Sequence, residues 1–195
     1  ASSADYNTCV GNNSGLDIST GAKNTFLGPF AGQNNTTGFE NTAVGYNAMG
    51  DGVTTGSANI AIGPENGYIS SGNGNIAMGY SALGNSLGGL TTGHRNICIG
   101  DASGFNLTSG DNNILIGWNA GRTGSSAPMS MSGITSEDNY INMGNESHTN
   151  ALVQVVWTIN SDARDKTEIK ELDLGLEFVN KLKPVTYKWD KRSKY

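Results

Sequence analysis

The sequence predicts an all-β protein: a trimeric β-solenoid or β-roll shaft of ~17-residue repeats, followed by a short α+β segment. Three observations lead to this prediction. Gly and Asn are in excess, a short apolar motif recurs between them, and the composition changes sharply near residue 157. Together they describe a chain that is made mostly of turns and short strands.

The composition excludes several classes of protein. Gly supplies 28 and Asn 24 of the 195 residues, while 36% of the residues are apolar and 15% are charged. Gly is thus about twice its usual ~7% share, and charge is below its usual ~25%. A thick core of leucine-rich helices is not expected, and neither is a nucleic-acid partner, because the net charge is −5 and basic residues do not cluster. No apolar run approaches the ~18 residues of a membrane span and no signal segment is visible, so we expect no membrane insertion.

Seven near-copies of one motif recur along the first part of the chain. They read NTCVG, NTFLG, NTAVG, NIAIG, NIAMG, NICIG and NILIG, and they begin at Asn7, Asn24, Asn41, Asn59, Asn75, Asn96 and Asn113. A degenerate copy, NYINMG, begins at Asn139. A second glycine follows each of the seven Asn residues after about eight positions, at Gly15, Gly32, Gly50, Gly67, Gly84, Gly104 and Gly121. Because Gly and Asn tolerate positive φ, each copy predicts a turn, a short strand and a turn, with Asn and Thr ladders along the stack.

Both faces of the predicted strands are apolar. The residue after the Asn is Thr or Ile and the residue two further on is aliphatic, and these two share one face because side chains alternate in a strand. The residue between them is Cys, Phe, Ala or Leu, where a position facing water would be polar. One face can fill the lumen of stacked coils, and we expect neighbouring subunits to cover the other. The simplest assembly is a homotrimer about the long axis, ~35–40 Å long. The alternative is a monomeric solenoid whose second face touches loops.

Repeats of the form TG-x-x-N-[TI]-x-Φ-G are similar to those of bacteriophage tail fibres, and they also resemble the β-roll heads of trimeric autotransporter adhesins. The resemblance covers about residues 6–145. It implies a homotrimer that presents a stiff rod to a cell surface.

A step in charge predicts a domain boundary. Residues 1–157 contain 13 charged side chains, whereas residues 158–195 contain 16. We therefore expect a Gly/Asn-rich fibre domain over 1–157 and a second domain beginning at 158. In and around the second domain, the patterns predict a strand over 152–159, a helix over 173–182 that ends before Pro184, and a strand over 185–189.

The second domain begins with SDARDK at residues 161–166 and contains LKPVTYKW at residues 182–189. These motifs resemble the start of the intramolecular chaperone at the C-terminus of phage tailspikes and fibres, which is named after the endosialidases. The resemblance implies a domain that helps three chains to trimerise and then releases itself. It makes Ser161 the nucleophile and Lys166 its base, with the scissile bond at Ser161–Asp162.

The proposed dyad is chemically reasonable. A serine hydroxyl is a poor nucleophile until a base takes its proton, and a lysine can be that base if burial lowers its pKa. We expect at most a single turnover of self-cleavage, and no turnover enzyme. The structural alternative is that Ser161 caps the following turn and that Lys166 is a solvated surface charge.

No cofactor or metal is expected. His94 and His148 are isolated, without the ligand spacing of a zinc site. Cys9 and Cys98 occupy the same repeat position five coils apart, ~24 Å in the stacked arrangement, which is far beyond disulfide reach. Both are predicted to be buried free thiols.

Three aromatic residues, Tyr46, Tyr80 and Trp118, each follow a motif Asn by five positions. They are weak candidates for stacking on the sugars of a host glycan. They are equally suited to cover the coil edge or the seam between subunits, and we favour this structural role. The irregular segments 85–90 and 122–138 are better candidates for receptor contact, because functional loops often interrupt a rigid scaffold.

We therefore expect a structural and host-adhesion component of a phage tail fibre, extracellular on the virion tail. Its partners would be its own copies, other tail proteins, and a bacterial surface glycan or protein receptor. A bacterial trimeric surface adhesin is the alternative. An ice-binding solenoid is a third possibility, but it needs a continuous row of Thr, and the strand Thr changes to Ile from the copy at Asn59 onward.

Overall fold

The computed structural model describes residues 4–52, 54–84, 92–122 and 134–150. The chain divides into two compact units, 1–151 and 152–195, and all the described residues belong to the first. The segments predicted at 152–159, 173–182 and 185–189 lie outside the described residues. The α+β segment and the boundary near residue 157 therefore stay predictions.

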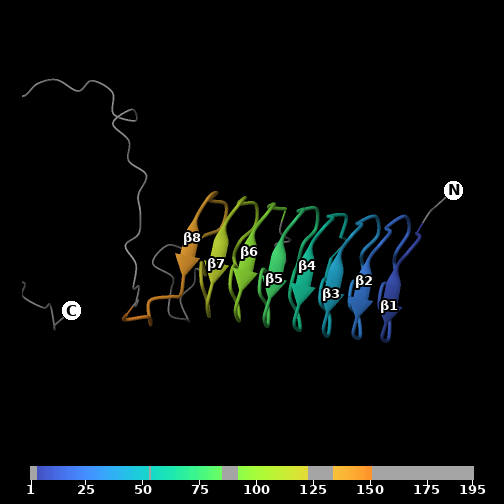
Figure 1. The fold of residues 1–195 in the computed structure, drawn as a ribbon, viewed down its shortest axis with the longest axis horizontal. Helices are drawn as coiled ribbons and strands as arrows, with labels where there is room; N and C mark the ends of the chain where they lie inside the picture. The colour runs from blue at the N-terminus through green and yellow to red at the C-terminus, as the bar shows by residue number, and fades with distance from the viewer. Residues whose placement is uncertain (1–3, 53, 85–91, 123–133, 151–195) are drawn as a thin grey trace, which may run out of the picture. The chain divides into compact units, whose positions relative to one another are not determined.

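The first unit is a parallel β-solenoid, as predicted (Figure 1). Each coil contributes one three-residue strand, and the strands pair in chain order and in the same register, middle residue opposite middle residue. The strands are β1 (Thr8–Val10), β2 (Thr25–Leu27), β3 (Thr42–Val44), β4 (Ile60–Ile62), β5 (Ile76–Met78), β6 (Ile97–Ile99), β7 (Ile114–Ile116) and β8 (Ile141–Met143). The described residues contain no helix.

The motif asparagines form a buried ladder along the stack. Asn59 shows the pattern: its Oδ1 accepts the backbone N–H of Asn75 at 2.9 Å and the Nδ2–H of Asn75 at 3.1 Å. Its own Nδ2 donates to the Oδ1 of Asn41 at 3.2 Å and to the carbonyl of Gly72 at 2.8 Å. Gly72 is one of the glycines that lie three residues before the motif Asn in six of the seven copies. The buried amide is thus fully paired, which is why a polar residue is tolerated there.

Each regular coil turns at four residues of positive φ. Relative to the ladder Asn they lie at positions −1, +4, +6 and +8, and in the coil of β2 they are Lys23, Gly28, Phe30 and Gly32. In two coils the structure corrects the predicted turn glycine. Gly50 and Gly84 lie one residue too late, and Met49 (φ 52°) and Leu83 (φ 47°) hold the left-handed position instead.

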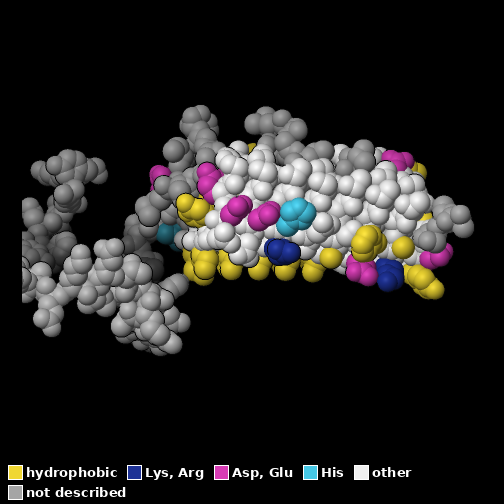
Figure 2. Space-filling view, turned by 90° about the horizontal axis from the view of Figure 1, so that it is seen from above, with side chains coloured by type: hydrophobic (Ala, Val, Ile, Leu, Met, Phe, Trp, Pro, Cys, Tyr) yellow, Lys and Arg dark blue, Asp and Glu magenta, His cyan; other side chains and the backbone are white. Residues whose placement is uncertain are grey.

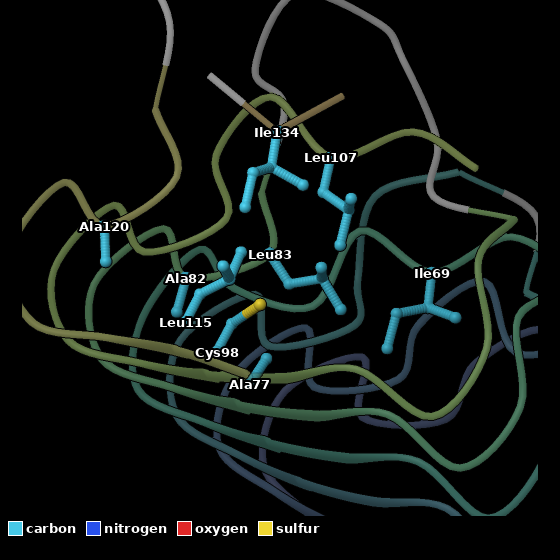
Figure 3. Packing of buried hydrophobic residues seen from close by; sticks show 9 residues of the cluster. All are labelled: Ile69, Ala77, Ala82, Leu83, Cys98, Leu107, Leu115, Ala120 and Ile134. Atoms are coloured by element: carbon cyan, nitrogen blue, oxygen red, sulfur yellow. The ribbon is translucent and has the colours of Figure 1, made fainter. Parts of the chain in front are cut away.

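The lumen is filled by the middle residue of each strand together with side chains from the turns (Figure 3). The two contributions compensate within one coil. Beside the large Phe26 stands Gly32, where an added Cβ would lie 2.5 Å from the ring. Beside the small Ala43 stands Met49, whose buried side chain fills the space that Phe26 fills one coil earlier. The same pairing of a small middle residue with a large turn residue recurs at Ala77 and Leu83, where the larger side chain takes the left-handed conformation.

The regular stack ends at β8. The degenerate copy pairs one residue later than its sequence indicated, because Ile141 lies opposite Ile114. Tyr140 therefore holds the ladder position, and its N–H donates the last hydrogen bond of the ladder to Oδ1 of Asn113 at 2.8 Å. Asn142 replaces the apolar middle residue. A tyrosine ring cannot continue the amide ladder, so this coil closes the repeat pattern.

Candidate functional site

The outward face of the sheet is an exposed apolar surface that runs along the stack. The first and third residue of each strand point away from the lumen, in two columns. The first column is Thr8, Thr25, Thr42, Ile60, Ile76, Ile97, Ile114 and Ile141, and the third is Val10, Leu27, Val44, Ile62, Met78, Ile99, Ile116 and Met143. Figure 2 shows hydrophobic side chains in a row along one long edge of the unit. We call this surface the sheet face.

The two strand faces differ in what covers them. The middle residues from Phe26 to Leu115 are buried inside the coil, so the chain itself encloses that face. On the sheet face the exposed fraction is 37% at Ile62 and reaches 64% at Met143. The sequence predicted two apolar faces, and the structure identifies the middle position as the lumenal one. In the described residues the sheet face is left partly exposed, and the trimeric and the monomeric arrangement both stay predictions.

The polarity of the sheet face changes along the stack. In β1 to β3 the first column is Thr, whereas from β4 onward both columns are aliphatic or Met. With strands ~4.8 Å apart, the seven intervals give a face ~34 Å long and two side chains wide. The third column is apolar along this whole length, and an exposed apolar strip of this kind is a candidate interaction surface.

Two rows of exposed residues border the sheet face. The leading edge holds the residue before each ladder position: Lys23, Glu40, Ala58, Gly74, Arg95 and Asn112. The trailing edge holds the residue after the +4 glycine: Pro29, Tyr46, Pro64, Tyr80, Asp101 and Trp118. Backbone bonds keep each row in register, such as Arg95 N–H to the Asn73 carbonyl and Ala102 N–H to the Tyr80 carbonyl, both 2.9 Å.

The three candidate aromatics lie together on the trailing edge, in alternate coils. Tyr46, Tyr80 and Trp118 are each about half exposed. The ring of Tyr46 meets Phe30 edge-on at 5.8 Å, and the Tyr80 hydroxyl donates to Glu65 at 3.1 Å. This hydrogen bond raises the pKa of the Tyr80 phenol. Their role in binding a ligand stays a prediction.

A second side-chain ladder, which the sequence analysis missed, runs two residues before the asparagine ladder. Each side chain accepts the backbone N–H of the preceding coil: Nδ1 of His94 accepts from Asn73 at 3.1 Å, and Oδ1 of Asp111 accepts from His94 at 2.7 Å. Asp138 continues the row by accepting from Asp111 at 2.7 Å. The recurrence of acceptor side chains at this offset was the available signal. It gives His94 a structural role.

The two cysteines differ from each other. Both are free, but Cys9 is exposed, which corrects the prediction that both are buried. Cys9 lies in β1, at the end of the sheet, and has a neighbouring strand on one side only. Cys98 lies between Ala77 and Leu115 in the lumen. Burial raises the pKa of the Cys98 thiol to about 12, so it is no nucleophile at neutral pH.

The predicted dyad cannot be placed. Ser161, Asp162 and Lys166 lie outside the described residues. Within the described ranges, no group of three or more His, Cys, Asp or Glu side chains is arranged to hold a metal ion. A search of the same residues finds no helix that is long and apolar enough to span a membrane.

The comparison with known families identifies the last segment. Residues 161–194 match the family model described as chaperone of endosialidase. The match begins at Ser161 and includes both motifs on which the resemblance was based. It covers 34 of the 195 residues, so it describes this segment and leaves the solenoid unassigned. No curated protein and no solved structure matches the chain.

Proposed function

We propose that this chain is the distal part of a phage tail fibre or tailspike: a homotrimeric β-solenoid shaft that folds with the help of its C-terminal chaperone segment. The observation that carries the proposal is the match of residues 161–194 to the chaperone of endosialidase. The protein would then be an extracellular part of the virion tail. It would join other tail proteins at one end and position the fibre against a bacterial surface glycan or protein receptor.

The sheet face supports self-association independently of the family match. Transfer of apolar surface out of water contributes about 25 cal/mol per Å², and the sheet face offers this along its whole length. A surface with the same coil repeat would match the strand spacing of this face. A second and a third copy of the chain supply such surfaces, and a chaperone that promotes trimerisation would bring them together.

Light scattering tests the trimer. We expect a particle of three chains, where one full-length chain has a mass of 20.3 kDa. A particle with the mass of one chain at micromolar concentration would contradict the proposed assembly. Mass spectrometry of the same sample measures the length of the chain. Cleavage is therefore measured separately from assembly.

Self-cleavage would occur once per chain. Lys166, as a neutral amine, would take the proton of the Ser161 hydroxyl, whose oxygen would attack the scissile carbonyl and form an ester. The C–N bond to Asp162 would break and its amine would receive the proton, and water would then hydrolyse the ester and free the Ser161 hydroxyl. The net reaction adds one water across the Ser161–Asp162 bond and gives a new carboxylate at Ser161 and a new amine at Asp162. The remaining product is a shaft that ends at residue 161.

Intact-mass spectrometry of the full chain, with any natural residues beyond 195 restored, tests this step. We expect a product that ends at Ser161, absent in Ser161→Ala and in Lys166→Ala. Lys170→Ala is the matched control, since it removes a nearby cation without touching the dyad, and it should cleave like the unmutated protein. Full-length chain alone from the unmutated protein would refute self-cleavage and leave the trimer proposal standing.

A further inference from the structure

We infer that the leading edge of one copy packs against the trailing edge of the next, and that Arg95 pairs with Asp101 of the partner subunit across this seam. The inference rests on the proposed trimer. It deepens that proposal, because it names the second copy, rather than a receptor, as the partner of the exposed aromatic row Tyr46, Tyr80 and Trp118.

The sheet face alone is too small for a stable interface. A strip ~34 Å long and ~10 Å wide presents about 350 Å², from the strand spacing and rise. A standard interface buries about 800 Å² per partner. The leading and trailing edges directly flank the strip, and all the residues that we assign to them are exposed in the single chain. They are the nearest surface that can supply the missing area.

Rotational symmetry decides which edges meet. In a closed ring of three copies the contact is heterologous, so one side of the sheet face meets the other side on the next copy. The strands run across the stack, and both edges of one coil therefore lie at about the same level (Figure 1). Without an axial shift, each coil meets its own counterpart. The pairs, leading edge first, are Lys23 with Pro29, Glu40 with Tyr46, Ala58 with Pro64, Gly74 with Tyr80, Arg95 with Asp101, and Asn112 with Trp118.

One of these pairs joins opposite charges, and another sets a ring against a glycine. Arg95 and Asp101 are both exposed, and the ion pair found among the described residues is Lys23 with Glu40. Arg95 and Asp101 flank the same strand β6, six residues apart and up to ~20 Å in an extended chain, so they face opposite sides of the strip. Tyr80 would lie against Gly74, which offers no side chain to obstruct the ring. Aromatic and Arg side chains are also those enriched at interface cores.

A charge-reversal cycle tests the seam. Arg95→Asp and Asp101→Arg each place like charges across it, and the double variant restores opposite charges in exchanged positions. We expect each single variant to lower the midpoint of thermal dissociation of the trimer by about 3–10 °C, and the double variant to recover most of the loss. Asp17→Arg is the control for Asp101→Arg, because it makes the same change of charge at an exposed residue away from both edges.

The outcomes separate the seam from the trimer. If the unmutated protein is a trimer and the three variants behave like Asp17→Arg, the seam is wrong and the trimer stands. The seam is also wrong if Trp118 fluorescence is quenched by iodide as readily in the trimer as in unfolded chain, measured in a Trp157→Phe, Trp189→Phe background. If Trp118 is accessible to iodide in the trimer, the aromatic row is free to bind a receptor glycan. A monomeric unmutated protein would overturn both proposals.

Discussion

The two faces of the same short strands show how differently one apolar pattern can be used. On the lumenal face, Ala43, Ala61 and Ala77 are completely buried because the chain wraps around them. On the sheet face, larger side chains such as Ile62 and Met78 stay exposed. The side chains on both faces of these strands are mainly apolar. Closure of the coil, and not apolar character, decides which face becomes the core of a single chain and which stays exposed.

Thiol labelling should show the largest contrast between an enclosed and an open position. Cys98 is enclosed and its thiol has a pKa of about 12, whereas Cys9 is exposed. We expect iodoacetamide to modify Cys9 in the native protein and to reach Cys98 at least ~10³-fold more slowly, through opening of the fold. Mass mapping of the labelled peptides measures both rates. Equal labelling of the two residues would contradict the enclosed lumen.

The same thiol predicts a loss of stability at alkaline pH. A raised pKa in the folded state means that stabilisation is complete below the unfolded value of 9.0 and is lost as the pH rises from 9 toward 12. Cys98→Ala removes this contribution. Urea titrations at pH 8 and pH 10.5 should therefore show a steeper loss for the unmutated protein than for Cys98→Ala.

The asparagine ladder should be the most sensitive part of the lumenal side. Asn59→Leu removes a side chain that makes four buried hydrogen bonds and leaves the N–H of Asn75 unpaired. We expect a loss of about 3–5 kcal/mol in the free energy of unfolding, measured with urea. Asn12→Ala, at an exposed corner, is the control and should change stability by less than about 0.5 kcal/mol. Comparable losses in the two variants would argue against a structural ladder.

Exchanging a large and a small side chain within one coil tests how tightly the lumenal face is packed. Ala43→Phe overfills the lumen beside Met49, and we expect it to cost about 2–3 kcal/mol in unfolding free energy. Met49→Gly empties the same space and should cost a similar amount, reduced by relief of the left-handed φ. The double variant reproduces the Phe26–Gly32 arrangement and should recover at least ~1 kcal/mol. Strictly additive losses would show that the two positions do not share one space.

Substitutions on the sheet face should change the stability of the trimer. Ile97→Thr extends the polar column of β1 to β3 into the aliphatic part of the sheet face, while Thr25→Ile does the reverse. If the face is buried between copies, each change shifts trimer stability by about 1–2 kcal/mol per chain, down for Ile97→Thr and up for Thr25→Ile. Thermal dissociation at several protein concentrations measures the shift. Midpoints that do not move in either variant would mean that the face stays in water.

The smallest effect is expected at the left-handed corner of the leading edge. Ala58 is exposed and has φ 57°, a conformation that costs a residue with a Cβ roughly 1 kcal/mol relative to Gly. Ala58→Gly should therefore stabilise the fold by about 0.5–1 kcal/mol despite the greater freedom of the unfolded chain. Gly74, which already occupies the same corner one coil later with φ 69°, shows that Gly fits there. A loss of stability would contradict the strain argument.

Local pattern was sufficient for most of the fold. The spacing of Asn7 to Asn113 predicted the strands, and the recurring glycines predicted the turns that the structure shows. The predicted turn position was wrong where contacts between residues distant in sequence, and not local preference, determine which residue turns the chain. Gly50 and Gly84 marked the turn one residue late, because Met49 and Leu83 tolerate strain in order to fill space left by Ala43 and Ala77.

The candidate functional regions also differ in whether the sequence alone could reveal them. The motifs at 161–166 and 182–189 are contiguous, so the chaperone segment was recognisable from residues alone, and the family match agrees. The leading and trailing edges are each assembled from single residues in successive coils, and their members share no residue type. Such a row has no recognisable sequence motif, because its members become neighbours only when the coils stack.

The sequence by itself determined the repeat, the strand and turn positions, and the presence of two apolar faces, because these follow from local backbone preferences and the two-residue period of a strand. Only the tertiary structure decided which face is enclosed, which residues accept the left-handed turns, and that Arg95 and Asp101 stand at opposite borders of one strip. These properties depend on the volume and direction of side chains brought together by coil stacking. Distance along the chain does not contain that information.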